Sequence, residues 1–226
     1  PGAMDELHAS LTRLLADTFG QAVIGDEYEI GRIEERCREN LENNVHNPEL
    51  KAKLTPDYKA ACKRLIISTG FYEAIQSPNA ELVTEPILGV EMSGVRTKDG
   101  RLHEIDVLVL ATGFNGHSFM RPMDIIGRGG AQLKEIWAKS TRAHRCISIP
   151  EFPNFFMLVG PNSPIGNFSL IDIAEKQLDY IMQLIEIWRL GRVNEISPKR
   201  TAMERFNDEI EAAMGNTVWV TGCKSW

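Results

Sequence analysis

The chain has 226 residues, of which 43% are hydrophobic and 25% charged, with 18 glycines and 11 prolines. This length suits one large domain or two small ones, and the composition excludes disordered, collagen-like and coiled-coil proteins. The formal net charge of −6 at pH 7 gives no electrostatic attraction to a nucleic acid or an anionic membrane. We therefore expect neither as a partner.

The four cysteines are spread along the chain, at Cys37, Cys62, Cys146 and Cys223. They show neither the C-x-x-C pairs of a zinc ribbon nor the density of a secreted disulfide scaffold, so we expect a cytoplasmic protein. The five histidines are isolated, and this spacing predicts no metal site. Residues 152–171 are numerous enough to cross a bilayer, but their prolines and asparagines exclude a membrane span.

The N-terminal quarter of the chain has helical periodicity. We interpret residues 1–4 as a cloning remnant. From Asp5 to about Asn47, apolar residues recur every third or fourth position, which predicts two amphipathic helices. Asn47 followed by Pro48 predicts a short helical turn, and Pro56 marks a boundary.

The apolar pattern then changes to that of strands. The runs 87–90 and 95–102, the latter broken by Lys98-Asp99-Gly100, predict a small β-meander with a hairpin turn. The runs 105–110 and 154–159 are almost continuously apolar and are predicted to be buried parallel strands. A polar loop, 160–167, then leads to a predicted helix from Ser169 to about Leu190, whose inward residues are Ile173, Leu178, Ile181, Leu184 and Ile185.

Three segments are candidate binding sites, each with a simpler alternative. Small residues at 111–114, after the first apolar run, would let a cofactor approach the backbone, although Gly113 also simply permits a turn. Lys63 and Arg64 suit a phosphate and a transient anion, although adjacent cations are often surface residues without a binding role. The loop 160–167 offers backbone donors to a ring or phosphate, but a helix entry capped by Ser169 explains it equally well.

These segments together resemble the Baeyer–Villiger type of the class B flavin-dependent monooxygenases. The resemblance covers nearly the whole chain but only the C-terminal part of that family's sequence. It rests on ordered blocks that include Leu54 to Tyr58 with Cys62-Lys63-Arg64, Ser77-Pro78-Asn79 with Leu82-Val83, Asp106 through Ala111-Thr112-Gly113-Phe114, Phe152-Pro153-Asn154 with Gly160-Pro161-Asn162, Glu175 with Gln177, and Lys224-Ser225-Trp226.

The resemblance implies an enzyme with two cofactors, FAD and NADPH. In that family NADPH reduces FAD, and a peroxyflavin inserts one oxygen atom of O2 into a carbonyl compound or a soft heteroatom. By analogy Lys63 pairs with the 2′-phosphate of NADPH, Arg64 is the catalytic residue that stabilises the peroxyflavin anion, and Trp226 contacts the nicotinamide nucleotide. The resemblance also implies that FAD is lined by Ala111, Thr112, Gly113 and Phe114. It implies that the flavin ring or the substrate is lined by Pro164, Ile165, Gly166 and Asn167.

The resemblance also implies the fold. We expect an α/β chain with partial doubly wound, Rossmann-like sheets from two nucleotide-binding domains, plus the N-terminal helices and the β-meander. Residues 5–56 would be a helical segment of the NADPH domain, 57–115 its remainder and a linker, and 116–226 the C-terminal part of the FAD domain.

The sequence departs from the family at its cofactor anchors. Neither G-x-G-x-x-G turn is present, and Met120 stands where the family fingerprint has a histidine. Since such a turn presents helix N-terminal amides to a pyrophosphate, the principal anchor for both cofactors is absent. The resemblance also leaves the predicted strands 105–110 and 154–159 without their first parallel neighbours, so we expect a missing N-terminal half, self-association or a rearranged partial fold. Two alternatives are an α/β module that serves association or weak nucleotide binding, and an NADPH-dependent reductase without oxygen chemistry.

Overall fold

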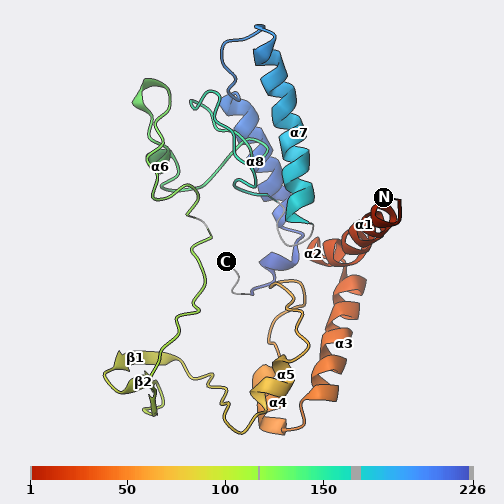
Figure 1. Cartoon of the computed structure of the whole chain (residues 1–226), viewed down its shortest axis with the longest axis vertical. Helices are drawn as coiled ribbons and strands as arrows, with labels where there is room; N and C mark the ends of the chain where they lie inside the picture. The colour runs from red at the N-terminus through yellow and green to blue at the C-terminus, as the bar shows by residue number, and fades with distance from the viewer. Residues whose placement is uncertain (1, 117, 164–168, 224–226) are drawn as a thin grey trace. The chain divides into compact units, whose positions relative to one another are not determined.

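The computed structural model of the chain describes residues 2–116, 118–163 and 169–223. Helices and one small sheet alternate with long irregular segments (Figure 1). The helices are α1 (Gly2–Leu15), α2 (Gln21–Val23), α3 (Glu27–Asn44), α4 (Pro48–Leu54), α5 (Phe71–Ile75), α6 (Leu133–Ile136), α7 (Leu170–Arg189) and α8 (Arg200–Met214), with a π-helical turn η1 (Ala16–Gly20) and 3-10 turns η2 (Arg128–Gly130) and η3 (Val218–Val220). The strands are β1 (Ile87–Glu91), β2 (Gly94–Thr97) and β3 (Leu102–Glu104).

The chain forms two compact units that interleave in sequence. The first comprises Pro1–Ile33, Tyr58–Leu65 and Asn115–Trp226, and the second comprises Glu34–Asp57 and Ile66–Phe114. The assignment of segments 5–56, 57–115 and 116–226 to cofactor-binding domains stays a prediction.

The helices predicted from periodicity are confirmed. The segment 5–47 contains α1 and α3, and Asn47 begins α4 by accepting hydrogen bonds from the Glu49 and Leu50 amides at 2.9 and 3.0 Å. The predicted helix after residue 169 is α7, and the Ser169 hydroxyl caps it by accepting from the Asp172 amide. On α7, Ile173 and Ile181 are buried as expected. Leu178 is 45% exposed, so its inward assignment is wrong.

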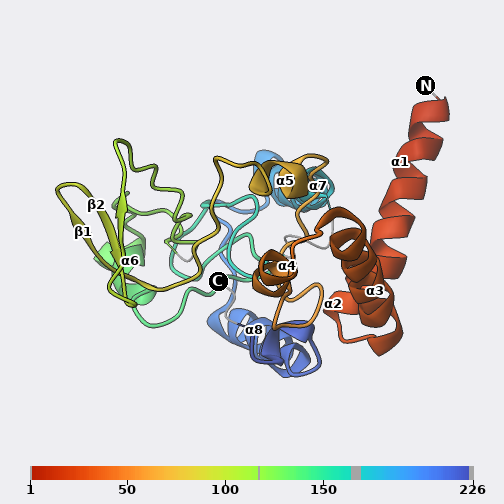
Figure 2. The same ribbon diagram turned by 90° about the horizontal axis from the view of Figure 1, so that it is seen from below.

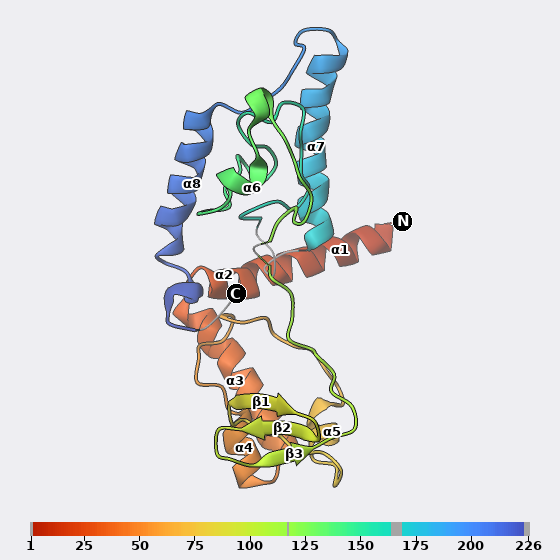
Figure 3. The same ribbon diagram turned by 90° about the vertical axis from the view of Figure 1, so that its left-hand side faces the viewer.

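The β-meander is also confirmed. The strands β1, β2 and β3 pair antiparallel in that order (Figure 3). The Gly100 amide donates to the Thr97 carbonyl at 3.0 Å, which closes the predicted turn at 98–100. Gly100 has a φ of +88°, a left-handed conformation that glycine adopts without strain.

The two predicted parallel strands are wrong. Residues 105–110 and 154–159 form no strand, and Val107 and Val109 are 75% and 79% exposed. An apolar run becomes a central strand only when neighbouring strands satisfy its backbone groups on both sides. The described residues contain one sheet, the antiparallel meander. Neither run therefore has the neighbours that a parallel strand needs.

The first unit is held by two apolar clusters. One joins segments distant in sequence, since Val23 of α2 and Val218 of η3 pack with Ala61 and Cys62. The other surrounds Trp137, whose indole N–H donates to the Arg142 carbonyl at 2.9 Å. In contrast, α1 buries none of its residues and extends beyond α2 (Figure 2).

Candidate functional site

Lys63 and Arg64 are two adjacent cations on the segment that follows Cys62. The Lys63 ammonium lies 4.2 Å from the centre of the Tyr58 ring, which favours this position through a cation–π contact. Lys63 is half-buried and Arg64 is exposed. Within the described part of the chain, neither pairs with a carboxylate, whereas nearby Lys59 forms an ion pair with Glu27 at 2.6 Å. The two side chains are therefore available to an anion from outside the chain.

The residue before Lys63 anchors this segment. Cys62 is 1% exposed in the first apolar cluster and forms a disulfide with Cys223, 161 residues away, with their Cα atoms 6.3 Å apart. Sequence analysis did not anticipate this bond. No local pattern identifies it, because four cysteines allow three pairings and sequence cannot choose among them. Trp226, which comes three residues after Cys223 in the sequence, lies outside the described residues.

The segment 111–114 belongs to the second unit. All four of its residues are exposed, and Gly113 has a φ of +83° with no atom near the position that a Cβ would take. The sequence alternative of a glycine that permits a turn is thus compatible with the backbone. The predicted contact of Ala111, Thr112, Gly113 and Phe114 with a cofactor stays a prediction.

Two buried amides hold the loop 159–163. The Gln177 carbonyl oxygen on α7 accepts from the Val159 amide at 2.7 Å, and its NH2 group donates to the Ser163 hydroxyl at 3.2 Å. Asn207 on α8 accepts from the Asn162 side chain at 2.9 Å and donates to the Ala143 and Met203 carbonyls. The irregular chain carrying this loop lies between α7 and α8 (Figure 3). The two helices thereby fix the loop from different sides.

The backbone of this loop is strained. Val159 and Asn162 have φ values of 53° and 65°, and a β-branched residue at positive φ is a genuine outlier. Gly160 comes so near Cys146 that an added Cβ would lie 2.2 Å from its carbonyl oxygen. Such a conformation costs about 1–3 kcal/mol per residue and persists only when its surroundings over-determine it. Gln177 and Asn207 supply that determination.

In the sequence, Gln177 was identifiable only through the resemblance, Asn162 also as part of the candidate loop 160–167, and Asn207 was missed. The one signal for Asn207 in the sequence was an asparagine inside an otherwise regular helical pattern. Asparagine is a poor helix former, because its side chain competes for backbone bonds. The predicted flavin-ring or substrate residues Pro164, Ile165, Gly166 and Asn167 lie outside the described residues.

Two titratable side chains near this loop are kept neutral. Burial raises the pKa of the Cys146 thiol, although a hydrogen bond to Ser163 opposes the shift. Burial, followed by the charge of Arg145, lowers the pKa of His144. Its Nδ1 atom is buried and has no hydrogen-bond partner among the described residues. A protonated thiol is a weak nucleophile, so Cys146 is better suited to packing than to nucleophilic chemistry.

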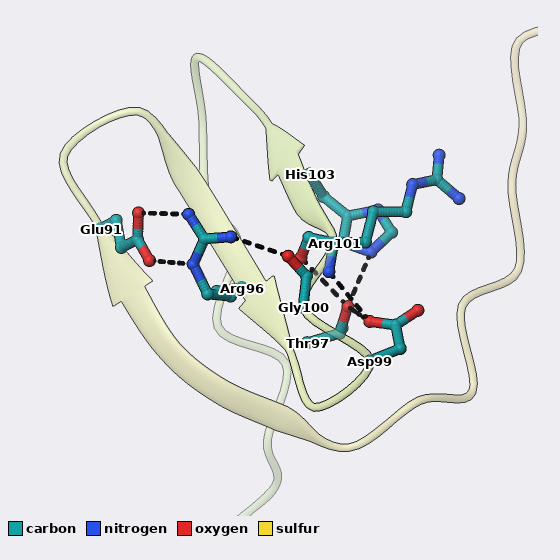
Figure 4. A network of polar contacts seen from close by, with 7 residues as sticks. All are labelled: Glu91, Arg96, Thr97, Asp99, Gly100, Arg101 and His103. Atoms are coloured by element: carbon teal, nitrogen blue, oxygen red, sulfur yellow. Dashed lines mark hydrogen bonds and ion pairs between the residues drawn. The ribbon is translucent and has the colours of Figure 1, made fainter.

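A second polar network closes the hairpin between β2 and β3 (Figure 4). The Thr97 hydroxyl lies 2.5 Å from an Asp99 carboxylate oxygen and 3.2 Å from His103 Nε2. A nucleophilic triad needs its carboxylate on the histidine, with the histidine free to take the hydroxyl proton. Here the Thr97 hydroxyl donates a hydrogen bond directly to Asp99, and this bond lowers the pKa of the Asp99 carboxyl. The network stabilises the turn and is not an active site.

In residues 2–116, 118–163 and 169–223, no cluster of histidine, cysteine, aspartate or glutamate has the geometry of a metal site. Within the same ranges, every helix is too short or too polar to cross a bilayer.

Comparison with known proteins relates most of the chain to monooxygenases. No family model matches it. An uncharacterized monooxygenase of Mycobacterium tuberculosis is 51% identical over 190 residues, which cover 84% of this chain and 38% of the relative. A Baeyer–Villiger monooxygenase of Streptomyces coelicolor is 34% identical over 208 residues, covering 91% of this chain and 40% of the relative.

A solved structure gives the same answer. Cyclohexanone monooxygenase from Rhodococcus sp. Phi1 bound to NADP+ superimposes with a TM-score of 0.79 at 31% identity, over 91% of this chain and 38% of that one. The resemblance to Baeyer–Villiger monooxygenases is confirmed. An FAD-binding monooxygenase of Aspergillus niger is also 34% identical over 184 residues, 79% of this chain and 30% of the relative. FAD and NADP are thus the cofactors of these relatives, and the α/β fold is that of the Baeyer–Villiger monooxygenases.

These matches also have a limit in length. The chain spans about two fifths of the Baeyer–Villiger monooxygenase from Streptomyces and of the cyclohexanone monooxygenase. Substrate, activity and partners of a whole enzyme are therefore matters for proposal.

Replacing Gln177 by Leu should free the loop 159–163. The substitution removes both amide contacts and leaves the Val159 N–H without its acceptor, which should lower the free energy of unfolding by about 1–3 kcal/mol. Hydrogen exchange at the Val159 amide should accelerate. The matched control is Gln183→Leu on the same helix, because the Gln183 side chain bonds only to Asp179 one turn away. Equal effects of the two substitutions would contradict this role of Gln177.

Proposed function

We propose that this chain is the C-terminal portion of an FAD- and NADPH-dependent monooxygenase that inserts one oxygen atom of O2 into a carbonyl compound or a soft heteroatom. The similarity to an NADP+-bound cyclohexanone monooxygenase supports this proposal. The structural observation that carries it is the adjacent pair Lys63 and Arg64, which has no carboxylate partner among the described residues and follows a disulfide-bonded residue, Cys62.

The pair fits the phosphate of NADPH. A phosphate at neutral pH carries close to two negative charges, and charge-assisted bonds to ammonium and guanidinium groups are among the strongest in proteins. Lys63 would bind the 2′-phosphate and so select NADPH over NADH. Arg64, whose guanidinium stays charged at every working pH, would stabilise negative charge that develops during oxygen transfer.

The fit to the rest of the cofactors is incomplete. NADPH supplies a hydride, and a bound flavin activates oxygen. A pyrophosphate anchor requires a glycine-rich turn at a helix N-terminus, and the sequence contains no such turn. The same proposal includes the doubly wound sheets and the cofactor contacts of 111–114, 164–167 and Trp226. Complete sheets and a complete cofactor site would need residues from outside this chain.

The exposed apolar residues fit a covering polypeptide. Val107, Val109 and Leu110 are each at least 75% exposed, and Phe114 is fully exposed. An apolar run of this kind marks an interface, and backbone groups that lack a strand partner favour pairing with another strand. We assign this cover to the remainder of a monooxygenase. Self-association is the second candidate, because the same run can pair with its copy.

Mutation of Lys63 tests the phosphate site in this chain alone. Lys63→Ala should raise the dissociation constant of 2′,5′-ADP about 10- to 100-fold, because one charge-assisted bond is lost. Lys63→Arg should retain most of the affinity. Titration calorimetry measures both, with 5′-AMP as the ligand that lacks the 2′-phosphate and Lys98→Ala as the matched surface control. Equal binding of the two nucleotides, or an equal effect of the control, would remove Lys63 from the phosphate site.

Reassembly tests the activity and the partner together. Co-expression with the part of the Streptomyces enzyme that this chain does not match should give a complex that retains FAD. That complex should oxidise NADPH in an O2-dependent reaction and convert cyclohexanone to a lactone, and Arg64→Met should abolish product formation. The Streptomyces enzyme split at the same position is the positive control. NADPH oxidation that needs no O2 would favour a reductase, and a flavin-free homodimer would favour the association module.

A further inference from the structure

Cys62 and Cys223 differ in their access to solvent. Cys62 is 1% exposed within the apolar cluster formed by α2, η3 and Ala61. Cys223 packs at the edge of this cluster and is only partly buried. A reducing thiolate can therefore reach the sulfur of Cys223 more easily than that of Cys62, since thiol–disulfide exchange depends on access to the attacked sulfur.

The same site has a hydrogen-bond acceptor for each thiol. The Val218 carbonyl oxygen lies 3.3 Å from the Cys62 sulfur, and the Cys62 carbonyl oxygen lies 3.5 Å from the Cys223 sulfur. If the disulfide is reduced, each new S–H group has an acceptor in place. Reduction therefore leaves neither thiol without an acceptor.

The other two cysteines lack these properties. Cys37 is exposed and Cys146 is buried, and both are free thiols whose pKa is raised by burial. A raised pKa lowers the thiolate fraction and hence the reactivity. Among the described cysteines, Cys62 and Cys223 are the two whose positions allow a disulfide with each other.

This pair lies next to the phosphate-binding candidates along the chain. Lys63 directly follows Cys62, and the Cys62 amide donates to the Lys59 carbonyl at 3.3 Å. The backbone that carries both cations therefore begins at a residue covalently tied to Cys223, three residues after η3. Reduction breaks this covalent link, and the segment gains conformational entropy. Anion binding to the reduced chain must then overcome that entropy.

We propose that Cys62 and Cys223 form a reversible redox site that controls phosphate binding by Lys63 and Arg64, with the disulfide state as the tighter-binding form. The inference rests on the proposed phosphate site. Reduction by a dithiol breaks the S–S bond: one thiolate attacks the Cys223 sulfur, the Cys62 thiolate leaves and takes a proton, and the second dithiol sulfur releases Cys223. Hydrogen peroxide reverses the change, since two thiols and one peroxide give the disulfide and two water molecules.

The coupling must be reciprocal. If the disulfide strengthens phosphate binding by a given factor, the bound phosphate makes the disulfide harder to reduce by the same factor. The conformational entropy lost when one or two side chains are immobilised corresponds to a factor of about 3–10 in affinity. This sets the size of the expected effect.

The test uses the chain as purified, with 2′,5′-ADP as the probe. Treatment with a dithiol should add the mass of two hydrogen atoms and raise the dissociation constant about 3- to 10-fold. Cys223→Ser should bind like the reduced chain and should not respond to the dithiol. Cys37→Ser is the matched control and should respond like the wild type. In the reverse measurement, 2′,5′-ADP should shift the redox equilibrium of the pair toward the disulfide by the same factor.

Each other outcome overturns a defined part of the argument. A mass that does not change with dithiol overturns the redox site. Equal affinities in both redox states overturn the coupling and leave the phosphate site standing. If 2′,5′-ADP binds in neither state, the phosphate site fails and the redox control fails with it. Cys62→Ser is a second variant, and a folded Cys62→Ser chain that binds like the oxidised wild type also overturns the coupling.

Discussion

The covalent and apolar contact around Cys62 and Cys223 is the constraint on which the functional interpretation of this chain depends. It brings three segments that are distant in sequence into one cluster: α2, the loop that begins at Tyr58, and the 3-10 turn η3. Lys63 and Arg64 owe their fixed starting point to this cluster. Without it, the two cations would belong to a surface loop of average mobility, and their adjacency would carry little meaning.

A second constraint acts on the loop 159–163. The described residues that follow α6, 137–163, mostly lack regular secondary structure, so their backbone groups need partners from elsewhere. Gln177 and Asn207 supply partners from two helices and hold strained positions at Val159 and Asn162. In a mostly irregular region, buried amides thus perform the role that a sheet ladder performs in a regular fold.

Sequence predicted what depends on local pattern and failed where distant segments must meet. The helices from Asp5 to Asn47, the turn at Gly100 and the Ser169 cap follow from spacing and residue type. The runs 105–110 and 154–159 have strand composition, but a strand also needs neighbours, which no local pattern supplies. Lys63 and Arg64 were identifiable as adjacent cations. Their lack of carboxylate partners and the Cys62 to Cys223 bond became visible only in three dimensions.

The most direct test of the account is a crystal structure of the oxidised chain with 2′,5′-ADP. The account predicts the 2′-phosphate within about 2.7–3.2 Å of the Lys63 ammonium, with Arg64 on the same side of the segment and the bond between Cys62 and Cys223 intact. A phosphate bound at a different surface, or a Lys63 side chain directed away from the nucleotide, would contradict it.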